Sequence, residues 1–270
     1  MKLVYKQKAA CLAPRALKVV CVSLFQERRY RLKCRGRGLV SFTAKVKETD
    51  LWITAPKDLN QEAVESILRH RRGLEKYASL HPQFLTSLTP LPPDPWAPPL
   101  VRAMLAAGNA AGTGPMAAVA GALAQAVGKD LSPLAEGEVM VENGGDIYLE
   151  SPREVTVGLE AGDSPISGRL GISIAPEAMP LCLGTSSGTV GHSLSLGRAD
   201  AATVKAADGA LADAAATALG NRVKSAGDLQ EALDWVSTVP GVLGALIVVG
   251  RKLAAWGDME LVPLGQGGRE

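Results

Sequence analysis

The sequence has 270 residues, of which 47% are apolar, and its formal net charge at neutral pH is +2. A chain of this length and composition can bury a substantial core, either as one large domain or as two small ones. The nearly balanced charge argues against a general nucleic-acid-binding protein, because such a protein carries a strongly basic face.

The sequence shows no targeting or membrane segment. The apolar run from Ala9 to Phe25 is interrupted by Arg15 and Lys18, which makes residues 1–27 a poor signal peptide. The run from Val242 to Gly250 is too short to cross a bilayer. The cysteines lack the spacing of a metal site, and we interpret them as reduced, mostly buried thiols of a cytoplasmic protein: Cys11, Cys21, Cys34 and Cys182.

The N-terminal part of the chain predicts antiparallel strands followed by a helix. Residues 28–46 read as two strands that turn at residues 35–38, and residues 51–55 read as a third. A helix is predicted from Asn60, its N-cap, with His70 as a solvated histidine of its outer face. A basic cluster could hold phosphates, although such clusters are more often the solvated face of a strand: Arg28, Arg29, Arg31, Lys33, Arg35 and Arg37.

Residues 90–99, PLPPDPWAPP, predict an extended and stiff strap. The strap could link two elements, or it could lie across a subunit surface, which leaves a homodimer open. In either arrangement we expect Trp96 to anchor the strap in a groove. A proline-rich ligand for a domain of another protein is the alternative.

Residues 100–111 and 115–127 predict two helices of small and apolar side chains, the second with a proline at its first position and Gly128 as its stop. The start of the second helix exposes N–H groups next to Thr113 and Gly114. Such a helix start suits a phosphate or another anion. An ordinary turn between two helices explains the same pattern.

Residues 138–150 predict two strands joined by a tight turn at Asn143, Gly144, Gly145 and Asp146. Asn, Gly and Asp tolerate the positive φ angles that such a turn requires. A hairpin turn alone accounts for the pattern. Two adjacent glycines would also allow a ligand to approach the backbone closely.

Residues 185–221 combine a loop rich in glycine and hydroxyl side chains, a strand at about 202–206 and an alanine-rich helix. Asp213 and Thr217 are four residues apart, so both point to the same face of that helix. Their oxygen atoms suit a hard cation such as Mg²⁺, which commonly takes one or two protein oxygens and completes its shell with water and phosphate. A threonine bonded back to a carbonyl and an aspartate that faces water explain the same pair.

The letters of Gly184 to Gly188, GTSSG, also match the nucleophile motif of serine hydrolases. That motif needs a helix directly after the nucleophile, whereas His192 follows within the same loop, so we set this function aside. Neither a Walker lysine nor a zinc-binding spacing occurs.

The remaining elements complete a mixed fold. A helix is predicted at 226–239, and further strands at 155–160, 169–174, 242–249 and 253–264. Strands and helices alternate without regular βαβ spacing, which predicts an α+β fold with mixed, largely antiparallel sheets and packed helices.

A family resemblance is carried by the segments GPMAAVAGALA, ENGGDIYL, GTSSGTVGHSLS and ADAAATALGN. Together they resemble an uncharacterised branch of the ApbE superfamily, relatives of the FAD:protein FMN transferases, and the resemblance covers residues 29–262. The resemblance implies an ApbE-like fold with residues 1–270 as one domain and two closely associated α/β halves at about 28–150 and 151–265. It further implies a nucleotide-like small molecule as partner, with FAD or FMN and Mg²⁺ as cofactors.

The same resemblance implies roles for individual residues. Asp213 and Thr217 would hold the metal, and His192 would be the catalytic base, although a histidine that only pins its loop explains the residue equally. The contacts to the nucleotide would come from Thr113, Gly114, Asn143, Gly144, Gly145, Asp146, Ser187 and Gly188.

Two positions depart from the transferase pattern. Where the family motif KGYxxD has a lysine and an acid, this chain has Thr113 and Ala118. Three hypotheses follow: a Mg²⁺-dependent transferase acting on a nucleotide or phosphorylated molecule, a flavin or nucleotide binder or sensor without transfer chemistry, and an interaction or scaffold protein that uses the proline-rich strap.

Overall fold

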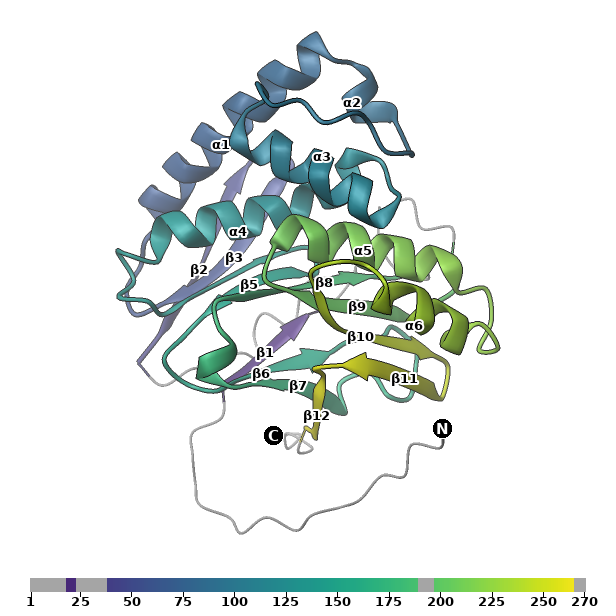
Figure 1. Ribbon diagram of the computed structural model, residues 1–270. Coiled ribbons are helices and arrows are strands. Elements are labelled where there is room, and N and C mark those ends of the chain that lie inside the picture. The colour runs from purple at the N-terminus through teal and green to yellow at the C-terminus, as the bar shows by residue number, and fades with distance from the viewer. Residues whose placement is uncertain (1–17, 23–37, 189–196, 265–270) are drawn as a thin grey trace.

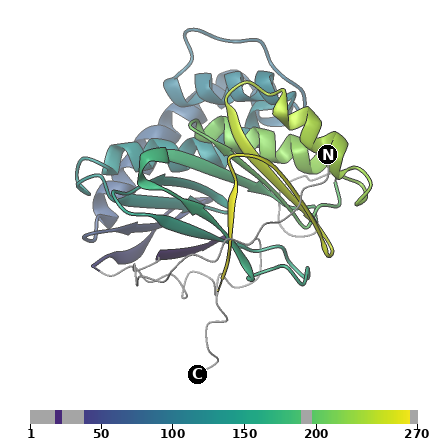
Figure 2. The same cartoon turned by 60° about the horizontal axis from the view of Figure 1, so that its bottom comes forward.

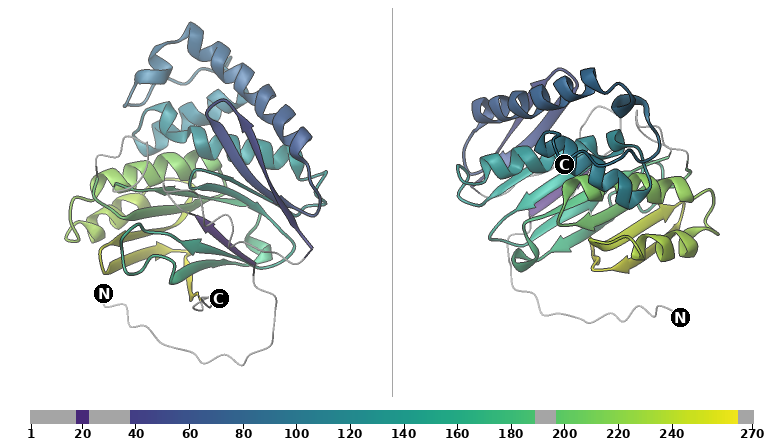
Figure 3. Two further views of the ribbon diagram at one scale, coloured as in Figure 1. Left: turned by 180° about the vertical axis from the view of Figure 1, so that it is seen from behind. Right: turned by 45° about the horizontal axis from the view of Figure 1, so that its top comes forward.

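The computed structural model describes residues 18–22, 38–188 and 197–264. Their elements form three layers (Figure 1): helices cover one face of an eight-stranded sheet, and a four-stranded sheet lies against its other face. Figure 2 shows the same layers with the bottom of the molecule turned forward, and the left view of Figure 3 shows them from behind. The predicted α+β class with largely antiparallel sheets is confirmed.

The large sheet is antiparallel at every described pair of neighbouring strands. Its order is β11 (Lys252–Gly257), β10 (Val242–Val249), β9 (Ala201–Ala206), β8 (Leu181–Ser186), β5 (Asp146–Glu150), β4 (Val139–Asn143), β3 (Thr49–Ala55) and β2 (Val40–Val46). Strands from before and after residue 150 share this sheet, and the division into two halves stays a prediction.

The small sheet has the order β1 (Lys18–Val22), β6 (Val155–Leu159), β7 (Leu170–Ile174) and β12 (Glu260–Pro263). β1 and β6 run parallel, and the other pairs are antiparallel. The predicted strand at 253–264 is therefore two strands, because the chain bends at Gly257, whose φ is 73°. β11 stays in the large sheet, and β12 crosses to the small one.

The helices are α1 (Asn60–Leu80), α2 (Gln83–Thr86), α3 (Pro99–Ala111), α4 (Val119–Leu131), α5 (Gly209–Arg222) and α6 (Leu229–Ser237), with short 3₁₀ turns η2 (Pro115–Ala118) and η3 (Pro176–Ala178). α5 packs against β8, β9, α3 and α4. All of its alanines are buried, because small side chains let a helix approach its neighbours on several sides.

The core follows the alternation of strand side chains between the two faces of the large sheet. In β4, Val139 and Val141 pack with the helices, whereas Met140 packs with residues of the small sheet. This alternation separates a helix-side core from an inter-sheet core. Every side chain of a central strand can therefore be assigned to one of the two faces.

Gly128 lies inside α4 and does not end it, contrary to the sequence prediction. A Cβ at this position would lie 2.1 Å from the ring of Tyr148. The glycine therefore lets α4 lie directly on β5, and the helix continues to Leu131.

Trp96 of the proline-rich strap also differs from expectation. Trp96 is 94% exposed, so it does not anchor the strap. Hydrogen bonds from Tyr77 to Asp94 and from Asn109 to the carbonyl of Leu91 hold the strap instead.

His70 is partly buried and is not a freely solvated side chain. Its Nε2 lies 2.7 Å from Oδ2 of Asp130 and joins α1 to α4. The charged outer face of the helix concealed this contact in the sequence.

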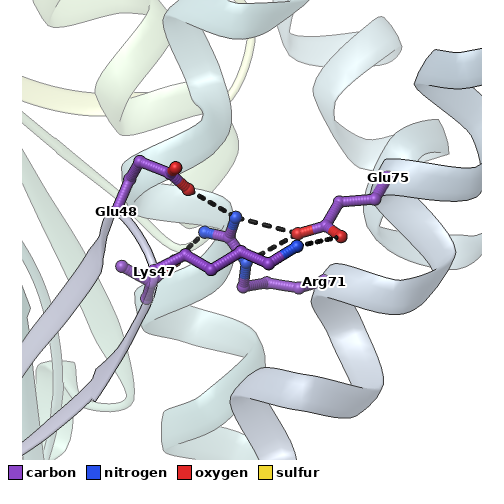
Figure 4. Close-up of polar contacts among 5 residues, drawn as sticks. Lys47, Glu48, Arg71 and Glu75 are labelled. Atoms are coloured by element: carbon purple, nitrogen blue, oxygen red, sulfur yellow. Dashed lines mark hydrogen bonds and ion pairs between the residues drawn. The ribbon is translucent and has the colours of Figure 1, made fainter.

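Ion pairs tie the β2–β3 turn to α1 (Figure 4). Lys47 binds Glu75 at 2.7 Å, and Arg71 binds both Glu48 at 2.6 Å and Glu75 at 2.9 Å. Glu48 is largely exposed, and exposed pairs of this kind stabilise a fold only slightly.

Within the described part of the chain, none of the helices is long and apolar enough to cross a membrane.

Candidate functional site

α5 lies directly on β8 because a glycine leaves room for it. A Cβ at Gly184 would lie 2.4 Å from the backbone carbonyl that precedes Asp213 and 2.6 Å from the nitrogen of Asp213 itself. Further along, a Cβ at Gly220 would lie 3.6 Å from Oγ of Ser186. Thr217, one turn after Asp213, lies between these two contacts along the helix.

The carboxylate of Asp213 is held by the start of α4. Its Oδ2 accepts hydrogen bonds from the backbone N–H groups of Ala120 and Gly121, each at 3.0 Å. The first turn of a helix leaves N–H groups without intrahelical partners, and α4 has no side-chain cap of its own. Asp213 therefore supplies the negative charge at the N-terminus of α4 from a different helix.

The anion site predicted next to Thr113 and Gly114 has a different form. The helix proper begins at Val119, and its first N–H groups bind Asp213. Thr113 is buried and its Oγ1 has no hydrogen-bond partner. A Cβ at Gly114 would lie 1.8 Å from the carbonyl oxygen of Ser87, so chain packing requires this glycine. Contact of either residue with a ligand stays a prediction.

The predicted tight turn between β4 and β5 is confirmed. Gly144 and Gly145 have φ values of 63° and 116°, which side chains rarely tolerate. The flanking residues Asn143 and Asp146 pair across the hairpin. Nδ2 of Asn143 donates to the carbonyl of Ala120 at 3.0 Å, so the turn is joined to the same residue of α4 that binds Asp213.

Asp146 lies on the helix-covered face of the large sheet. Alternate residues of a strand share a face, and Tyr148, two residues further on, packs in the helix-side core. Continuing the register between β5 and β8 by one residue sets Asp146 opposite Gly184, the glycine that contacts Asp213. The two aspartates therefore belong to one region between the sheet, α4 and α5.

Both carboxyl groups have raised pKa values. Burial is the largest cause that raises the pKa of Asp146, and the negative charge of Asp213 is the next. A hydrogen bond from the backbone of Thr185 lowers this pKa, and Glu142 raises it by a smaller amount. The resulting pKa of Asp146 lies well above its ordinary range. Burial also raises the pKa of Asp213 to about 7, although the N–H groups of α4 lower it. The raised pKa values favour the protonated, neutral form of both carboxyl groups in the free protein.

Ser187 and Gly188 stand at the end of β8. Ser187 is buried, and the N–H of Gly188 donates to the carbonyl of Ala199 at 2.8 Å. A Cβ at Gly188 would lie 2.2 Å from the carbonyl oxygen of Gly197, so these two residues are in contact. His192 lies outside the described residues, and its role as a base stays a prediction.

A small cavity of ≈ 10 Å³ lies between the two sheets and is lined by Val157, Gly158, Leu159, Glu160, Ile172, Leu183, Thr185 and Thr203. This volume suits about one water molecule and excludes a nucleotide. The cavity lies across β8 from α5, because Leu183 and Thr185 alternate with the helix-facing Gly184. It is separate from the candidate site.

The side chains of the candidate site offer oxygen donors of the kind that Mg²⁺ prefers: Asp146, Asp213 and Thr217. Oδ1 of Asp146 is buried and has no hydrogen-bond partner, as expected for a group that binds something further. Among residues 18–22, 38–188 and 197–264, no three His, Cys, Asp or Glu side chains are grouped as a metal site. The oxygen donors of Asp146, Asp213 and Thr217 fit a hard cation that also takes water or ligand oxygens.

Sequence reasoning missed the start of α4 as part of this site. Ala120 and Gly121 contribute backbone groups, which their residue types do not reveal. The GPMAA segment was the available hint, because it marks a helix start near these residues.

A protein-family model described as "AbpE bacteria" matches residues 31–250. The chain belongs to this family. One relative is the UPF0280 protein of Methanocella arvoryzae. It is 42% identical to this chain over 219 residues, which cover 80% of this chain and 89% of the relative. UPF0280 protein MJ1526 of Methanocaldococcus jannaschii is 40% identical over 224 residues, which cover 80% and 91%.

Solved structures share the fold of this AbpE-family chain. The flavin transferase ApbE from Vibrio cholerae superposes with a TM-score of 0.51 and 12% identity over 81% of this chain and 96% of that one. The apo form of the Pseudomonas stutzeri flavinyl transferase ApbE gives 0.52 and 12% identity over 81% and 94%. The family match, the relatives and these structures place the chain in an ApbE-like branch, as the sequence resemblance implied. Identities this low show the fold and leave the reaction open.

Proposed function

We propose that this protein binds a phosphorylated, nucleotide-like ligand together with a divalent cation. A flavin nucleotide is the first candidate ligand, because solved structures of the same fold are titled flavin transferases. Mg²⁺ is the first candidate cation, because the polar side chains of the site offer oxygen donors.

One observation carries this proposal. Ala120 at the start of α4 binds Asp213 through its N–H and Asn143 through its carbonyl. Two motifs that lie far apart in the sequence, the Asn-Gly-Gly-Asp turn and the Asp–Thr helix pair, therefore meet at one helix start. Their meeting, together with the unpartnered buried carboxyl oxygen of Asp146 in the turn, supports a ligand site over two unrelated structural features.

The cation would be held by Oδ1 of Asp213 and the hydroxyl of Thr217, since Oδ2 of Asp213 already binds α4. When bound, a divalent cation neutralises charge on a diphosphate and stabilises a leaving phosphate. The chain's own groups would then orient the ligand. Gly144 is exposed and presents backbone without a side chain, and Ser187 would supply a hydroxyl for a phosphate or ribose.

In the transferase form of this function, His192 would take the proton of an attacking hydroxyl. The second candidate function is ligand binding or sensing without transfer. Two departures from the transferase pattern favour it: Thr113 replaces the motif lysine, and Ala118, which replaces the acid, is completely buried.

Binding of FAD and FMN, measured by calorimetry with and without Mg²⁺, tests the proposal. Asp213→Asn keeps an acceptor oxygen for the α4 N–H groups but loses the charge, so it should fold normally and lose the Mg²⁺-dependent part of the affinity. Asp234→Asn, which changes an exposed acid of α6, is the control and should bind like the wild type. Absence of flavin nucleotide binding, or an unchanged Mg²⁺ dependence in Asp213→Asn, would contradict the proposal.

Product analysis separates the two candidate functions. Incubation with FAD, Mg²⁺ and a threonine-containing acceptor protein should release AMP if the chain is a transferase. Tight FAD binding without AMP release would favour the binding or sensing protein.

A further inference from the structure

We infer that Asp146 is a second carboxylate ligand of the cation, so that the cation site joins β5 to α5 across the glycine at position 184. This inference rests on the proposed function. It reassigns Asp146 from a residue that borders the nucleotide to one that binds the metal directly.

The position of Asp146 on its strand is the first support. Its side chain shares the helix-covered face of the large sheet with Tyr148. Its cross-strand neighbour on β8 is Gly184, and a side chain there would collide with the backbone of α5 at Asp213. Since Gly184 has no side chain, nothing from β8 projects between the carboxyl of Asp146 and the helix turn that carries Asp213.

The unsatisfied oxygen of Asp146 is the second support. Asp146 is only 5% exposed, and its Oδ1 has no hydrogen-bond partner. Leaving a buried carboxyl oxygen unpaired costs free energy, and native proteins rarely leave one without a reason. A bound cation supplies the missing partner.

The charge around Asp146 is the third support. Two further acids lie near its carboxyl group, Asp213 on α5 and Glu142 on β4. Glu142 belongs to the opposite face of the sheet, since Met140, two residues earlier, packs with the small sheet. Asp213 is therefore the acid that shares the helix-side region with Asp146. A divalent cation between these two carboxylates would balance their charge.

Mn²⁺ binding to the full chain without nucleotide, followed by the electron paramagnetic resonance signal of free Mn²⁺, tests the inference. Asp146→Asn and Asp213→Asn should each weaken Mn²⁺ binding by about tenfold or more. Glu142→Gln is the matched control, because it removes a buried acid from the opposite face and keeps an acceptor for the N–H of Gly145. It should weaken binding by less than about threefold.

The outcomes separate this inference from the proposed function. If Asp213→Asn loses Mn²⁺ but Asp146→Asn binds as the wild type does, the inference is wrong and the proposed cation site stands. If Glu142→Gln weakens binding as much as Asp146→Asn, general charge and not ligation explains the effect, and the inference is again wrong. If the wild type binds no Mn²⁺, both fail.

A measurement on the wild type covers the case in which Asp146→Asn does not fold. Infrared difference spectra of protein with ¹³C-labelled aspartate, recorded before and after Mg²⁺ addition, report how many aspartate carboxylates change. Two changed carboxylates support the inference, and one changed carboxylate overturns it.

Discussion

Replacing Gly184 with alanine should disturb the fold at the point where α5 meets β8. The added Cβ would lie 2.4 Å from both the carbonyl carbon and the oxygen of Ala212, and 2.6 Å from the nitrogen of Asp213. These atoms belong to a helix backbone, so no side-chain rotation relieves the overlap. The helix must move away from the strand, although α3 and α4 pack against its other sides.

The expected cost follows from overpacking. Forcing an extra methyl group into a close-packed interior typically costs about 1–3 kcal/mol, because neighbouring elements shift and lose contacts. The lower flexibility of alanine in the unfolded chain offsets about 0.4–1 kcal/mol of that cost. We therefore expect Gly184→Ala to lower the free energy of unfolding by roughly 1–2 kcal/mol. In a chain of this size, each kcal/mol corresponds to about 2–4 °C in Tm.

Urea unfolding, followed by circular dichroism, measures this change. Gly73→Ala in α1 is the matched control, since its Cβ would meet the side chain of Pro98 at an ordinary distance of 3.4 Å. Alanine inside a helix should stabilise that variant by about 0.5–1 kcal/mol. If Gly184→Ala unfolds within about 0.5 kcal/mol of the wild type, α5 does not lie on β8 as described, and the placement of Asp213 beside Asp146 falls with it.

Three further changes test separate parts of the structure. Lys47→Met should change the free energy of unfolding in urea by less than about 1 kcal/mol, because the pair of Lys47 with Glu75 is exposed; a loss well above that value would mean that the ion pairs anchor α1. Burial tends to raise the pKa of Asp130, but hydrogen bonds from α1 lower the pKa below 3.8. The ionised Asp130 therefore stabilises the fold above pH 3.8, and this stabilisation is lost as the pH falls through the lowered pKa. Asp130→Asn should therefore be less stable than the wild type at neutral pH and converge with it in acid, and parallel urea titrations over pH check this. Asp213 has the opposite sign: its pKa is raised from 3.8 to about 7, so the folded state keeps a proton that the unfolded chain releases. The wild type should lose stability relative to Asp213→Asn as pH rises between these values, and a constant difference across that range would contradict the raised pKa.

Local patterns in the sequence predicted the parts of the site that depend on neighbouring residues. The helical period placed Asp213 and Thr217 on one face of α5, and the structure has both on that helix. The run Asn-Gly-Gly-Asp predicted a turn with positive φ, and Gly144 and Gly145 adopt it. In both cases the deciding interactions lie within a few residues along the chain.

Long-range packing decided the features that the sequence did not predict. Gly128 reads as a helix stop and Gly184 as the first residue of a GTSSG motif, yet each lies inside an element where another element comes too close for a side chain. Trp96 was expected to anchor the strap in a groove, but hydrogen bonds at Asp94 and Leu91 hold the strap and leave the ring in solvent. A glycine or a tryptophan does not reveal in the sequence what lies opposite it.

The capping role of Asp213 does not compete with its proposed role as a cation ligand. The N–H groups of Ala120 and Gly121 bind Oδ2, so they fix the plane of the carboxylate and leave Oδ1 without a described partner in α4. Hydrogen bonds to one oxygen of a carboxylate ligand commonly orient the other toward a metal. The N–H groups at the start of α4 therefore hold Asp213 in place, and Asp213 gives these N–H groups a hydrogen-bond acceptor. A cap of this kind also explains the presence of an acid in a helix whose other residues are mostly alanine, glycine and leucine. The same carboxylate can stabilise α4 in the free protein and bind a cation beside Asp146.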